Sequence, residues 1–329
     1  MIMDDYIIKM DHLSKTYTVR EKTDAPFFKR VLGKKQYRNV EALKDVTMTI
    51  KKGEFVGLVG NNGAGKSTLV KLMTGLLYPT DGTVEVLGRD PFTDRLKNNQ
   101  EIGAVFGQRT QLNWDLSTID SLQLLKRIYD IDDITFSSNI EMFCDLFGMR
   151  DYINRPVRTL SLGQRMQCEL AAAFIHNPQM IFLDEPTIGL DVFNKDIIAN
   201  FLDTIKKTSN ATVILTTHDL EEMCRICDRI VVLSEGTILF EEDTDKLLSM
   251  HNQHKRLIFT TAEESCIPIS WDRAINSSYS SHKIICDSVQ REDIEYVISM
   301  VAKSSTIIDM KIEENSLTEI IKEYLKGNE

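Results

Sequence analysis

The sequence contains no apolar run that is long enough to cross a membrane. A transmembrane helix needs about 20 consecutive, mostly apolar residues, whereas the longest runs here, such as residues 230–233, have the length of a β-strand. The opening Met-Ile-Met-Asp-Asp has neither the basic start nor the apolar core of a signal peptide. We therefore expect a cytoplasmic chain that reaches a membrane only through a partner.

Basic residues are also in short supply, and several kinds of pattern are missing. The chain has 39 Lys and Arg against 49 Asp and Glu, a formal net charge of -10. Proteins that hold nucleic acid need an excess of Lys and Arg facing the phosphates, so we expect no nucleic-acid partner. Cys224 and Cys227 form one C-x-x-C, but no second pair stands at zinc-finger spacing. Repeats and low-complexity tracts are absent as well.

Strand-like and helix-like segments alternate through most of the chain. This alternation predicts an α/β fold with a largely parallel sheet that is covered on both faces. Residues 110–175 have a helical pattern and are expected to form an inserted helical subdomain. The expected strands of this first domain, residues 1–250, are 6–10, 54–59, 83–86, 102–106, 180–183, 212–215 and 230–233.

The composition changes after residue 250. The polar stretch 251–254 is interpreted as a linker, and residues 255–329 as a small α+β accessory domain. Its last helix is marked by a capping box, with Ser316 followed three residues later by Glu319. The expected strands are 257–261, 283–286 and 307–312, and the expected helices are 291–302 and 316–326.

A glycine-rich segment matches a phosphate-binding loop. Residues 60–67 read G-N-N-G-A-G-K-S and fit G-x-x-x-x-G-K-[ST], with a predicted strand before them and a predicted helix after. The glycines let backbone N–H groups face phosphate oxygens, and the helix dipole adds positive potential. Lys66 is expected to reach the terminal phosphates and Ser67 to hold Mg²⁺. The expected nucleotide contacts are Gly60, Asn61, Asn62, Gly63, Ala64, Gly65, Lys66, Ser67 and Thr68.

Two acidic residues end a later apolar strand. Residues 180–185 read M-I-F-L-D-E, so Asp184 and Glu185 are expected at the strand's carboxyl end. An aspartate in this position can hold Mg²⁺. The glutamate beside it can orient and deprotonate a water that attacks the terminal phosphate. Together with the phosphate loop, the pair predicts a nucleotide-hydrolysing site that uses ATP and Mg²⁺.

With these two motifs in place, the sequence resembles the ABC (ATP-binding cassette) ATPase family, a branch of the P-loop NTPases. Residues 160–164, L-S-L-G-Q, resemble the family signature L-S-G-G-Q and imply nucleotide contacts from Ser161, Gly163 and Gln164. His218 resembles the family's switch histidine, which contacts the γ-phosphate. The resemblance covers about residues 5–245 and extends to two further nucleotide-site residues, Asp191 of a D-loop and Tyr17, which would stack on adenine.

Two positions depart from the family pattern. Leu162 replaces the first glycine of the signature pair. The family's Q-loop usually reads V-F-Q after a strand, but residues 105–108 read V-F-G-Q. Gln108 is preferred as the Q-loop residue because Leu112 follows at the family's spacing, and it is expected to contact the metal and to contribute to catalysis. Gln111 is the weaker alternative.

The resemblance implies a dimer in which each ATP lies between the phosphate loop of one subunit and the signature of the other. The second subunit could be an identical copy or a paralogous ATPase. The resemblance also implies transmembrane permease subunits, most like those of ABC-2-type exporters, which would hold the chain on the inner face of the cell membrane. Their coupling helix would meet residues 108–116, including Trp114. The alternative is a soluble ABC ATPase that acts on ribosomes or DNA.

A basic insertion interrupts the start of the cassette at residues 20–39. Its residues 26–33 contain four apolar side chains that would lie within an arc of about 140° on a helix. Five basic residues and no acidic one lie between Lys29 and Arg38. A short amphipathic helix with basic flanks suits a membrane surface, so residues 26–38 are a possible membrane contact. The alternative is a solvated loop with its phenylalanines against the cassette.

Overall fold

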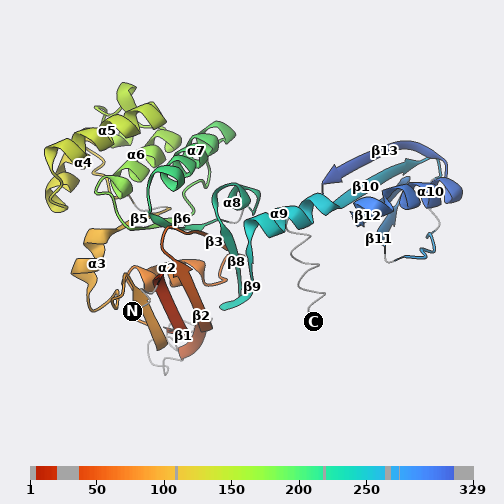
Figure 1. The fold of residues 1–329 in the computed structure, drawn as a ribbon, viewed down its shortest axis with the longest axis horizontal. Coiled ribbons are helices and arrows are strands. Elements are labelled where there is room, and N and C mark those ends of the chain that lie inside the picture. The colour runs from red at the N-terminus through yellow and green to blue at the C-terminus, as the bar shows by residue number, and fades with distance from the viewer. Residues whose placement is uncertain are drawn as a thin grey trace, which may run out of the picture. The chain divides into compact units, whose positions relative to one another are not determined.

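A computed structural model describes residues 5–20, 37–107, 110–217, 220–263, 268–273 and 275–314 (Figure 1). The chain divides into two compact units, Met1–Glu241 and Glu242–Glu329, which are treated separately below. The boundary lies earlier than the expected one near residue 250. The expected linker 251–254 instead contains the end of helix α9 (Thr244–Gln253) and the first residue of strand β10 (His254–Thr261). Polar residues such as Asn and Gln are only mildly unfavourable in a helix, so their cluster did not mark a break.

The first unit is built on a six-stranded sheet with the order β5-β6-β7-β3-β8-β9. The pairs β5–β6, β6–β7, β7–β3 and β3–β8 are all parallel, as the alternating sequence pattern predicted. The central strands are buried along nearly their whole length, which fits their continuous apolar sequences. The strands are β3 (Phe55–Val59), β5 (Ile102–Phe106), β6 (Met180–Asp184), β7 (Thr212–Thr216), β8 (Arg229–Ser234) and β9 (Thr237–Asp243).

A second sheet of the same unit is antiparallel, with the order β2-β1-β4. Strand β1 (Tyr6–Arg20) is far longer than the expected strand 6–10, and β2 (Tyr37–Lys51) was not expected at all. Register shifts interrupt the β1–β2 ladder between Met10 and Thr16, whereas residues 46–51 of β2 alternate regularly between buried and exposed positions. β4 (Asp81–Val86) contains the expected strand 83–86.

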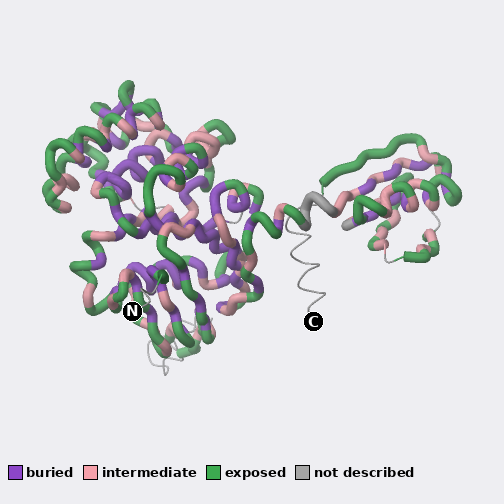
Figure 2. The backbone as a smooth tube through the Cα atoms, viewed as in Figure 1, coloured by how far each residue is buried: buried purple, intermediate pink, exposed green. Residues whose placement is uncertain are grey.

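Helix α2 (Lys66–Met73) lies between the two sheets and joins their cores. Its buried side chains Leu69 and Leu72 belong to one apolar cluster that also contains Ile8 of β1 and Phe182 of β6. Figure 2 shows the buried positions following the strands through the middle of this unit. The phosphate loop that precedes α2 is therefore held between two rigid layers.

Helices cover the first unit on the side of β5 and β6, where α4 to α7 gather in Figure 1. The ring of Phe201 on α7 packs against Phe147 of α5 at 4.6 Å and Phe174 of α6 at 4.9 Å between centroids. No helix among the described residues is long and apolar enough to cross a membrane. The helices are α3 (Arg95–Glu101), α4 (Thr118–Ile128), α5 (Asp133–Phe147), α6 (Leu162–Phe174), α7 (Val192–Thr208) and α8 (Leu220–Ile226).

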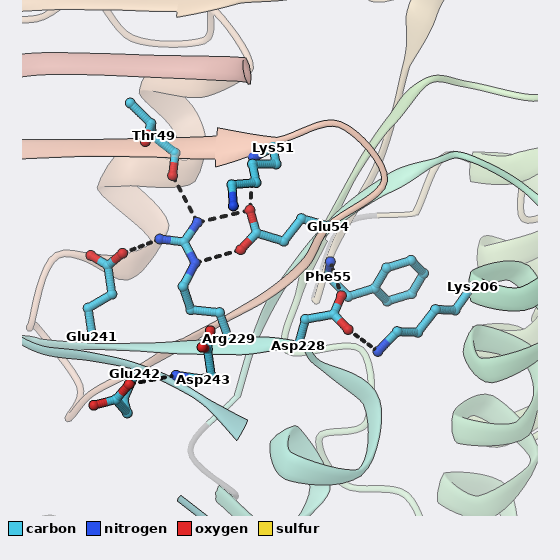
Figure 3. A network of polar contacts seen from close by, with 10 residues as sticks. All are labelled: Thr49, Lys51, Glu54, Phe55, Lys206, Asp228, Arg229, Glu241, Glu242 and Asp243. Atoms are coloured by element: carbon cyan, nitrogen blue, oxygen red, sulfur yellow. Dashed lines mark hydrogen bonds and ion pairs between the residues drawn. The ribbon is translucent and has the colours of Figure 1, made fainter. Parts of the chain in front are cut away.

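A partly buried ionic network ties the two sheets together at β8 (Figure 3). The Arg229 guanidinium donates two hydrogen bonds to the Glu54 carboxylate, at 2.6 and 3.0 Å, and a third to the Thr49 carbonyl of β2 at 2.8 Å. It also pairs with Glu241 of β9. Next to it, the Asp228 carboxylate accepts a hydrogen bond from the Phe55 backbone N–H at 2.9 Å. The start of β3, which leads to the phosphate loop, is thus anchored from both sides.

The second unit is a four-stranded antiparallel sheet with the order β11-β12-β10-β13. Helix α10 (Ile294–Ser304) packs on it through Val297 and Val301, against Leu257 and Phe259 of β10. β12 (Lys283–Gln290) and β13 (Ile307–Glu314) were expected, whereas the Ser-rich β11 (Asn276–Ser280) was not. The expected helix 316–326 lies outside the described residues.

The basic insertion is described only at its two ends. Arg20 and Tyr37 are paired as the last rung of the β1–β2 ladder, so the insertion leaves and returns at one end of a β-hairpin. Residues 21–36, with the expected amphipathic helix, lie outside the described residues.

Candidate active site

A pocket of 580 Å³ lies where the phosphate loop meets the carboxyl ends of the parallel strands. β3 is flanked by β7, and β7 by β6, so the residues that follow these three strands lie at one edge of the sheet. The lining residues are Ala42, Asn62, Gly63, Ala64, Gly65, Lys66, Ser67, Thr68, Lys71, Leu76, Phe106, Gly107, Asp184, Glu185 and Ile188. The sequence prediction had grouped residues 60–68 with Asp184 and Glu185, and of these residues the pocket lining contains all but Gly60 and Asn61.

The loop's tight path depends on glycine at position 65. Gly65 caps the N-terminus of α2 with a φ of 109°, a conformation that favours glycine. A Cβ atom there would lie 2.6 Å from the Ala42 carbonyl oxygen and 2.8 Å from Leu43. The Lys66 ammonium group donates to the carbonyl oxygens of Gly60, at 2.5 Å, and Asn61, at 3.3 Å. Gly60 and Asn61 therefore contact the pocket through Lys66 rather than lining it.

Asp184 and Ser67 lie close to each other in the pocket lining. The Ser67 hydroxyl lies 3.3 Å from Asp184 Oδ1. The hydroxyl of Thr216, at the end of β7, donates to the same oxygen at 2.6 Å. Thr216 is fully buried and was not among the predicted site residues. The sequence feature that could have indicated Thr216 is its position at a strand end, two residues before His218. The sequence does not show, however, that β7 lies beside β6.

Glu185 has an unusual backbone conformation that aims it into the pocket. Its φ is 54°, in the left-handed region, which is uncommon for a residue with a side chain. The conformation is held by the Glu185 backbone N–H, which donates to both the carbonyl and the hydroxyl oxygen of Thr216 at 3.0 Å. Strained residues of this kind cluster at functional sites.

The oxygen atoms at the pocket floor fit a magnesium ion. Mg²⁺ prefers one or two carboxylate or hydroxyl oxygens and completes its octahedron with water and phosphate oxygens. The Ser67 hydroxyl and the Asp184 carboxylate supply such oxygens within 3.3 Å of each other. Both lie beside the phosphate loop, so the donor set suits a metal that bridges protein and phosphates.

The signature residues lie outside this pocket, at the start of α6. Ser161 and Gln164 form a complete capping box: the Ser161 hydroxyl accepts from the Gln164 N–H at 3.2 Å, and the Gln164 side chain accepts from the Ser161 N–H at 3.1 Å. Leu162, the departure from the family signature, is 42% exposed beside them. None of the signature residues lines the pocket of the same chain.

Asn194 locks the signature helix to the D-loop. Its side chain accepts from Gln167 of α6 at 3.2 Å and donates to Asp191 at 2.9 Å. A Cβ at Gly163 would lie 2.4 Å from this side chain, so glycine is required for the contact. The Asn194 backbone N–H is the main cause that lowers the Asp191 pKa. Asn194 was not predicted, because its role depends on two helices that are distant in sequence.

The segment after β5 is fastened to α6 by a buried carboxylate. Glu169 accepts hydrogen bonds from the Thr110 hydroxyl and from the Gln111 backbone N–H, the latter at 3.0 Å. Burial raises the Glu169 pKa, and these two hydrogen bonds oppose the rise. The Gln111 side chain donates to the Ala104 carbonyl. Gln108, the preferred Q-loop residue, lies outside the described residues, as does His218.

Tyr17 and Trp114 are the two aromatic residues that the sequence suggested as contacts, for adenine and for a permease respectively. Tyr17 lies within β1 opposite Val40 and does not line the pocket, so its stacking on adenine stays a prediction. Trp114 is 47% exposed, and the Arg165 guanidinium lies 5.3 Å from its ring centroid. Trp114 is therefore not a core residue of the helical region, which leaves it accessible to a partner.

Comparisons with known proteins agree on one family. The family model described as ABC transporter matches residues 43–188. The ABC transporter ATP-binding protein NatA of Bacillus subtilis (strain 168) is 36% identical over 63% of this chain and 84% of its own length. The methionine import ATP-binding protein MetN 2 of Bacillus licheniformis is 34% identical, over 63% of this chain and 62% of its own length. The daunorubicin resistance ATP-binding protein DrrA3 of Streptomyces coeruleorubidus is 33% identical, over 65% and 67%.

Solved structures show the same similarity. CbiO1 from Clostridium perfringens, part of the ABC transporter complex CbiONQ, has a TM-score of 0.61 at 26% identity, covering 75% of this chain and 92% of that one. A dimeric structure of MJ0796, a bacterial ABC transporter cassette, has a TM-score of 0.59 at 28% identity, covering 72% and 98%. The same cassette has been solved as a dimer in a post-hydrolysis state bound to ADP and Pi.

Proposed function

The chain belongs to the ABC transporter family of ATP-binding, ATP-hydrolysing subunits, and we propose that it powers an exporter whose permease is made of separate membrane subunits. The observation that carries the proposal is the convergence of Lys66, Ser67, Asp184 and Glu185 around one pocket. Each of these side chains has the chemistry that hydrolysis of a phosphoanhydride requires.

ATP binds with its phosphates in the loop before α2. In this structure the Lys66 ammonium group contacts the carbonyl oxygens of Gly60 and Asn61. When ATP binds, it contacts oxygens of the β- and γ-phosphates instead. Ser67 and Asp184 would hold Mg²⁺, which would neutralise charge that develops on the phosphates. Gln108 would be a further metal ligand, and Tyr17 would stack on the adenine.

Glu185 acts as the general base. Its carboxylate lines the pocket and accepts a proton from the water that attacks the γ-phosphate. The two hydrogen bonds from the Glu185 N–H to Thr216 keep the side chain at a fixed point of the pocket rim. His218 follows Thr216 by two residues and contacts the γ-phosphate from the same strand end.

A second subunit completes each site. Ser161, Gly163 and Gln164 lie at a helix N-terminus outside the pocket of their own chain, where backbone N–H groups and the helix dipole suit an anion. In the proposed head-to-tail dimer they contact the γ-phosphate bound to the other subunit, with Asp191 alongside. Loss of the γ-phosphate removes the group that both subunits hold, so the dimer loosens and moves the attached permease.

Export is favoured over import by the similarity to DrrA3, whose name refers to daunorubicin resistance, together with the ABC-2-like features of the sequence. MetN 2, named for methionine import, is about equally similar, so the direction needs its own experiment. The permease would meet Trp114 on the exposed surface near α6, and residues 26–38 would lie near the membrane.

The direction can be tested with the two compounds that these relatives name. The full chain is expressed with the membrane proteins that copurify with it, and daunorubicin efflux and methionine uptake are measured in whole cells. Export predicts ATP-dependent efflux that the Lys66→Ala variant abolishes. Faster methionine uptake that depends on Lys66 would contradict export while leaving the ATPase assignment intact.

A further inference from the structure

The outer edge of the second unit's sheet is strand β13, and its apolar side chains are exposed. β13 pairs with β10 and with no other strand of the described residues. Ile308, Met310 and Ile312 are 67, 37 and 49% exposed. Edge strands are usually blunted by shortness, by proline, by charged side chains or by a bulge. β13 has eight residues and no proline, but charged side chains alternate with its apolar ones and its register with β10 shifts near Ile307. The unusual feature of this edge is therefore its exposed apolar stripe.

The register shows that this apolar stripe continues the buried face of the sheet. Met310 lies opposite Phe259 and Ile312 opposite Leu257. Residues that are directly opposite in a ladder project to the same face. Phe259 and Leu257 are both fully buried under α10. The face of the sheet that is buried on β10 is therefore exposed to solvent on β13.

A backbone donor is also available at this edge. The Met310 N–H donates to the side chain of its own neighbour, Asp309, at 2.8 Å. In an antiparallel ladder, a residue directs its N–H and C=O either to one neighbouring strand or to the other. Met310 therefore directs its N–H away from β10, and Asp309 occupies the place that the carbonyl of a further strand would take.

We propose that a second copy of this chain fills this edge, with its β13 running antiparallel to the first about a two-fold axis at Met310. The two four-stranded sheets would then form one sheet of eight strands. Met310 would face its own copy, and Ile312 would lie two positions further along each strand on the same face. The apolar stripes of both chains would then lie side by side on the same face.

Charge complementarity favours a second copy and this register over the two neighbouring ones. With the axis at Met310, Asp309 of each chain lies opposite Lys311 of the other, so each pair joins opposite charges. Moving the axis by one position to Asp309 or to Lys311 would put like charges directly opposite each other. The Asp309 carboxylate would then pair with the Lys311 ammonium group of the other chain and release the Met310 N–H. That N–H could then donate a hydrogen bond to the second strand.

The inference goes beyond the proposed function because this contact does not require nucleotide. It would keep two chains together between cycles in which ATP closes and opens the first units. A dimer held through β13 therefore has to persist in the absence of ATP and in the Lys66→Ala variant.

Disulfide formation at the two-fold axis gives the sharpest test. Directly opposed residues of an antiparallel hydrogen-bonded pair have Cα atoms about 5.5 Å apart, within the range a disulfide needs. Met310→Cys is introduced into the full chain, and mild oxidation is followed without nucleotide. The five cysteines of the described residues are buried, and the sixth, Cys266, lies outside the described residues and is replaced with Ser. The matched control is Ile312→Cys, which is more exposed but would lie about 13 Å from its own copy.

We expect Met310→Cys to form covalent dimers at least ten-fold faster than Ile312→Cys. Random collision would favour Ile312→Cys, so equal rates or the reverse order overturn the proposal. The protein could instead be a monomer in which the thiol at position 310 resists alkylation. If the thiol then becomes reactive when residues 315–329 are deleted, the chain's own C-terminal segment occupies the edge. A thiol that reacts freely in a monomer would leave the edge without an occupant. Either result overturns pairing with a second copy.

A charge swap tests the register independently. Lys311→Asp alone places two carboxylates at each opposed pair and is expected to weaken the nucleotide-free dimer about ten-fold in sedimentation equilibrium. Adding Asp309→Lys restores opposite charges and should restore the dimer. A swap that fails to restore it contradicts the register. Loss of ATP hydrolysis would instead count against the proposed function and would not affect this result.

Discussion

The hydroxyl of Thr216 donates to Asp184 Oδ1 at 2.6 Å, while the same residue accepts the backbone N–H of Glu185 through two oxygens. One buried threonine on β7 thus positions both acidic residues that end β6. It acts on the site through its neighbours rather than by contact with nucleotide.

Replacing Thr216 with Val keeps the side-chain shape and removes the hydroxyl. Asp184 would lose a donor and the Glu185 N–H one of its two acceptors. Outer-shell partners of a metal ligand typically contribute about 10–100-fold to affinity or activity, so we expect kcat to fall at least ten-fold and the Mg²⁺ requirement to rise. Steady-state phosphate release over a range of Mg²⁺ concentrations measures both. Thr216→Ser should recover most of the activity, and a Val variant with the parental Mg²⁺ dependence would contradict the role.

Gly163→Ala tests whether Asn194 couples the signature helix to the D-loop. The added Cβ would lie 2.4 Å from the Asn194 side chain, which must then leave Asp191 and Gln167. We expect a loss of ATP hydrolysis with little change in ATP affinity measured by fluorescence, since this pocket is elsewhere in the chain. Asn194→Ala removes the same two contacts without the added methyl group and should cause a similar loss of hydrolysis. Because the contacts are then already absent, adding Gly163→Ala should cost little more, and a double variant that is much less active than either single variant would show that the defect has another cause.

The parts of the fold that the sequence predicted are those specified by short-range patterns. The strand, glycine loop and helix around Lys66 depend on neighbouring residues, and the continuous apolar strands β3, β6 and β7 need no knowledge of their partners. Strand β2 was missed although residues 46–51 alternate between buried apolar and exposed polar positions. Thr216 and Asn194 were missed because their roles depend on which strands and helices lie side by side, and this order is not local to any segment.

His176 makes the first unit sensitive to acid. Its ring stacks on Tyr129 at 3.9 Å, and burial lowers its pKa from 6.5 to about 4. Above pH 6.5 the histidine is neutral in both states, so it does not affect stability. Between pH 6.5 and 4 the unfolded chain takes up a proton that the folded chain refuses, and the free energy of unfolding falls by at most about 3 kcal/mol.

His176→Phe keeps the stacked ring and removes the titration. We expect urea midpoints of the variant to depend less steeply on pH between 6.5 and 4 than those of the parent. At pH 7.5 the variant should be less stable by about 1 kcal/mol, because the hydrogen bond to the Ile102 carbonyl is lost. Parallel pH profiles of the two proteins would show that His176 is not the responsible group.

Arg229→Met removes the centre of the ionic network in Figure 3. The side chains of Arg229 and Glu54 are only 13 and 14% exposed, and removing one partner of a buried pair typically costs about 3–5 kcal/mol. We expect a loss of this size in the first unit's unfolding transition. Arg150→Met is the control, because Arg150 also pairs with two carboxylates, Glu141 and Asp145, but is exposed. Its loss should cost less than about 1 kcal/mol, and equal effects would refute the contrast.

The most direct test of the central claim is the rate of phosphate release by Glu185→Gln. The amide keeps the shape of the side chain but cannot accept a proton, so turnover should fall at least 100-fold while ATP still binds. The matched control is Glu235→Gln, an exposed glutamate with a similar left-handed backbone, φ 48°, which should keep the parental rate. If Glu185→Gln hydrolyses ATP at the parental rate, Glu185 is not the base and this account of the site is wrong.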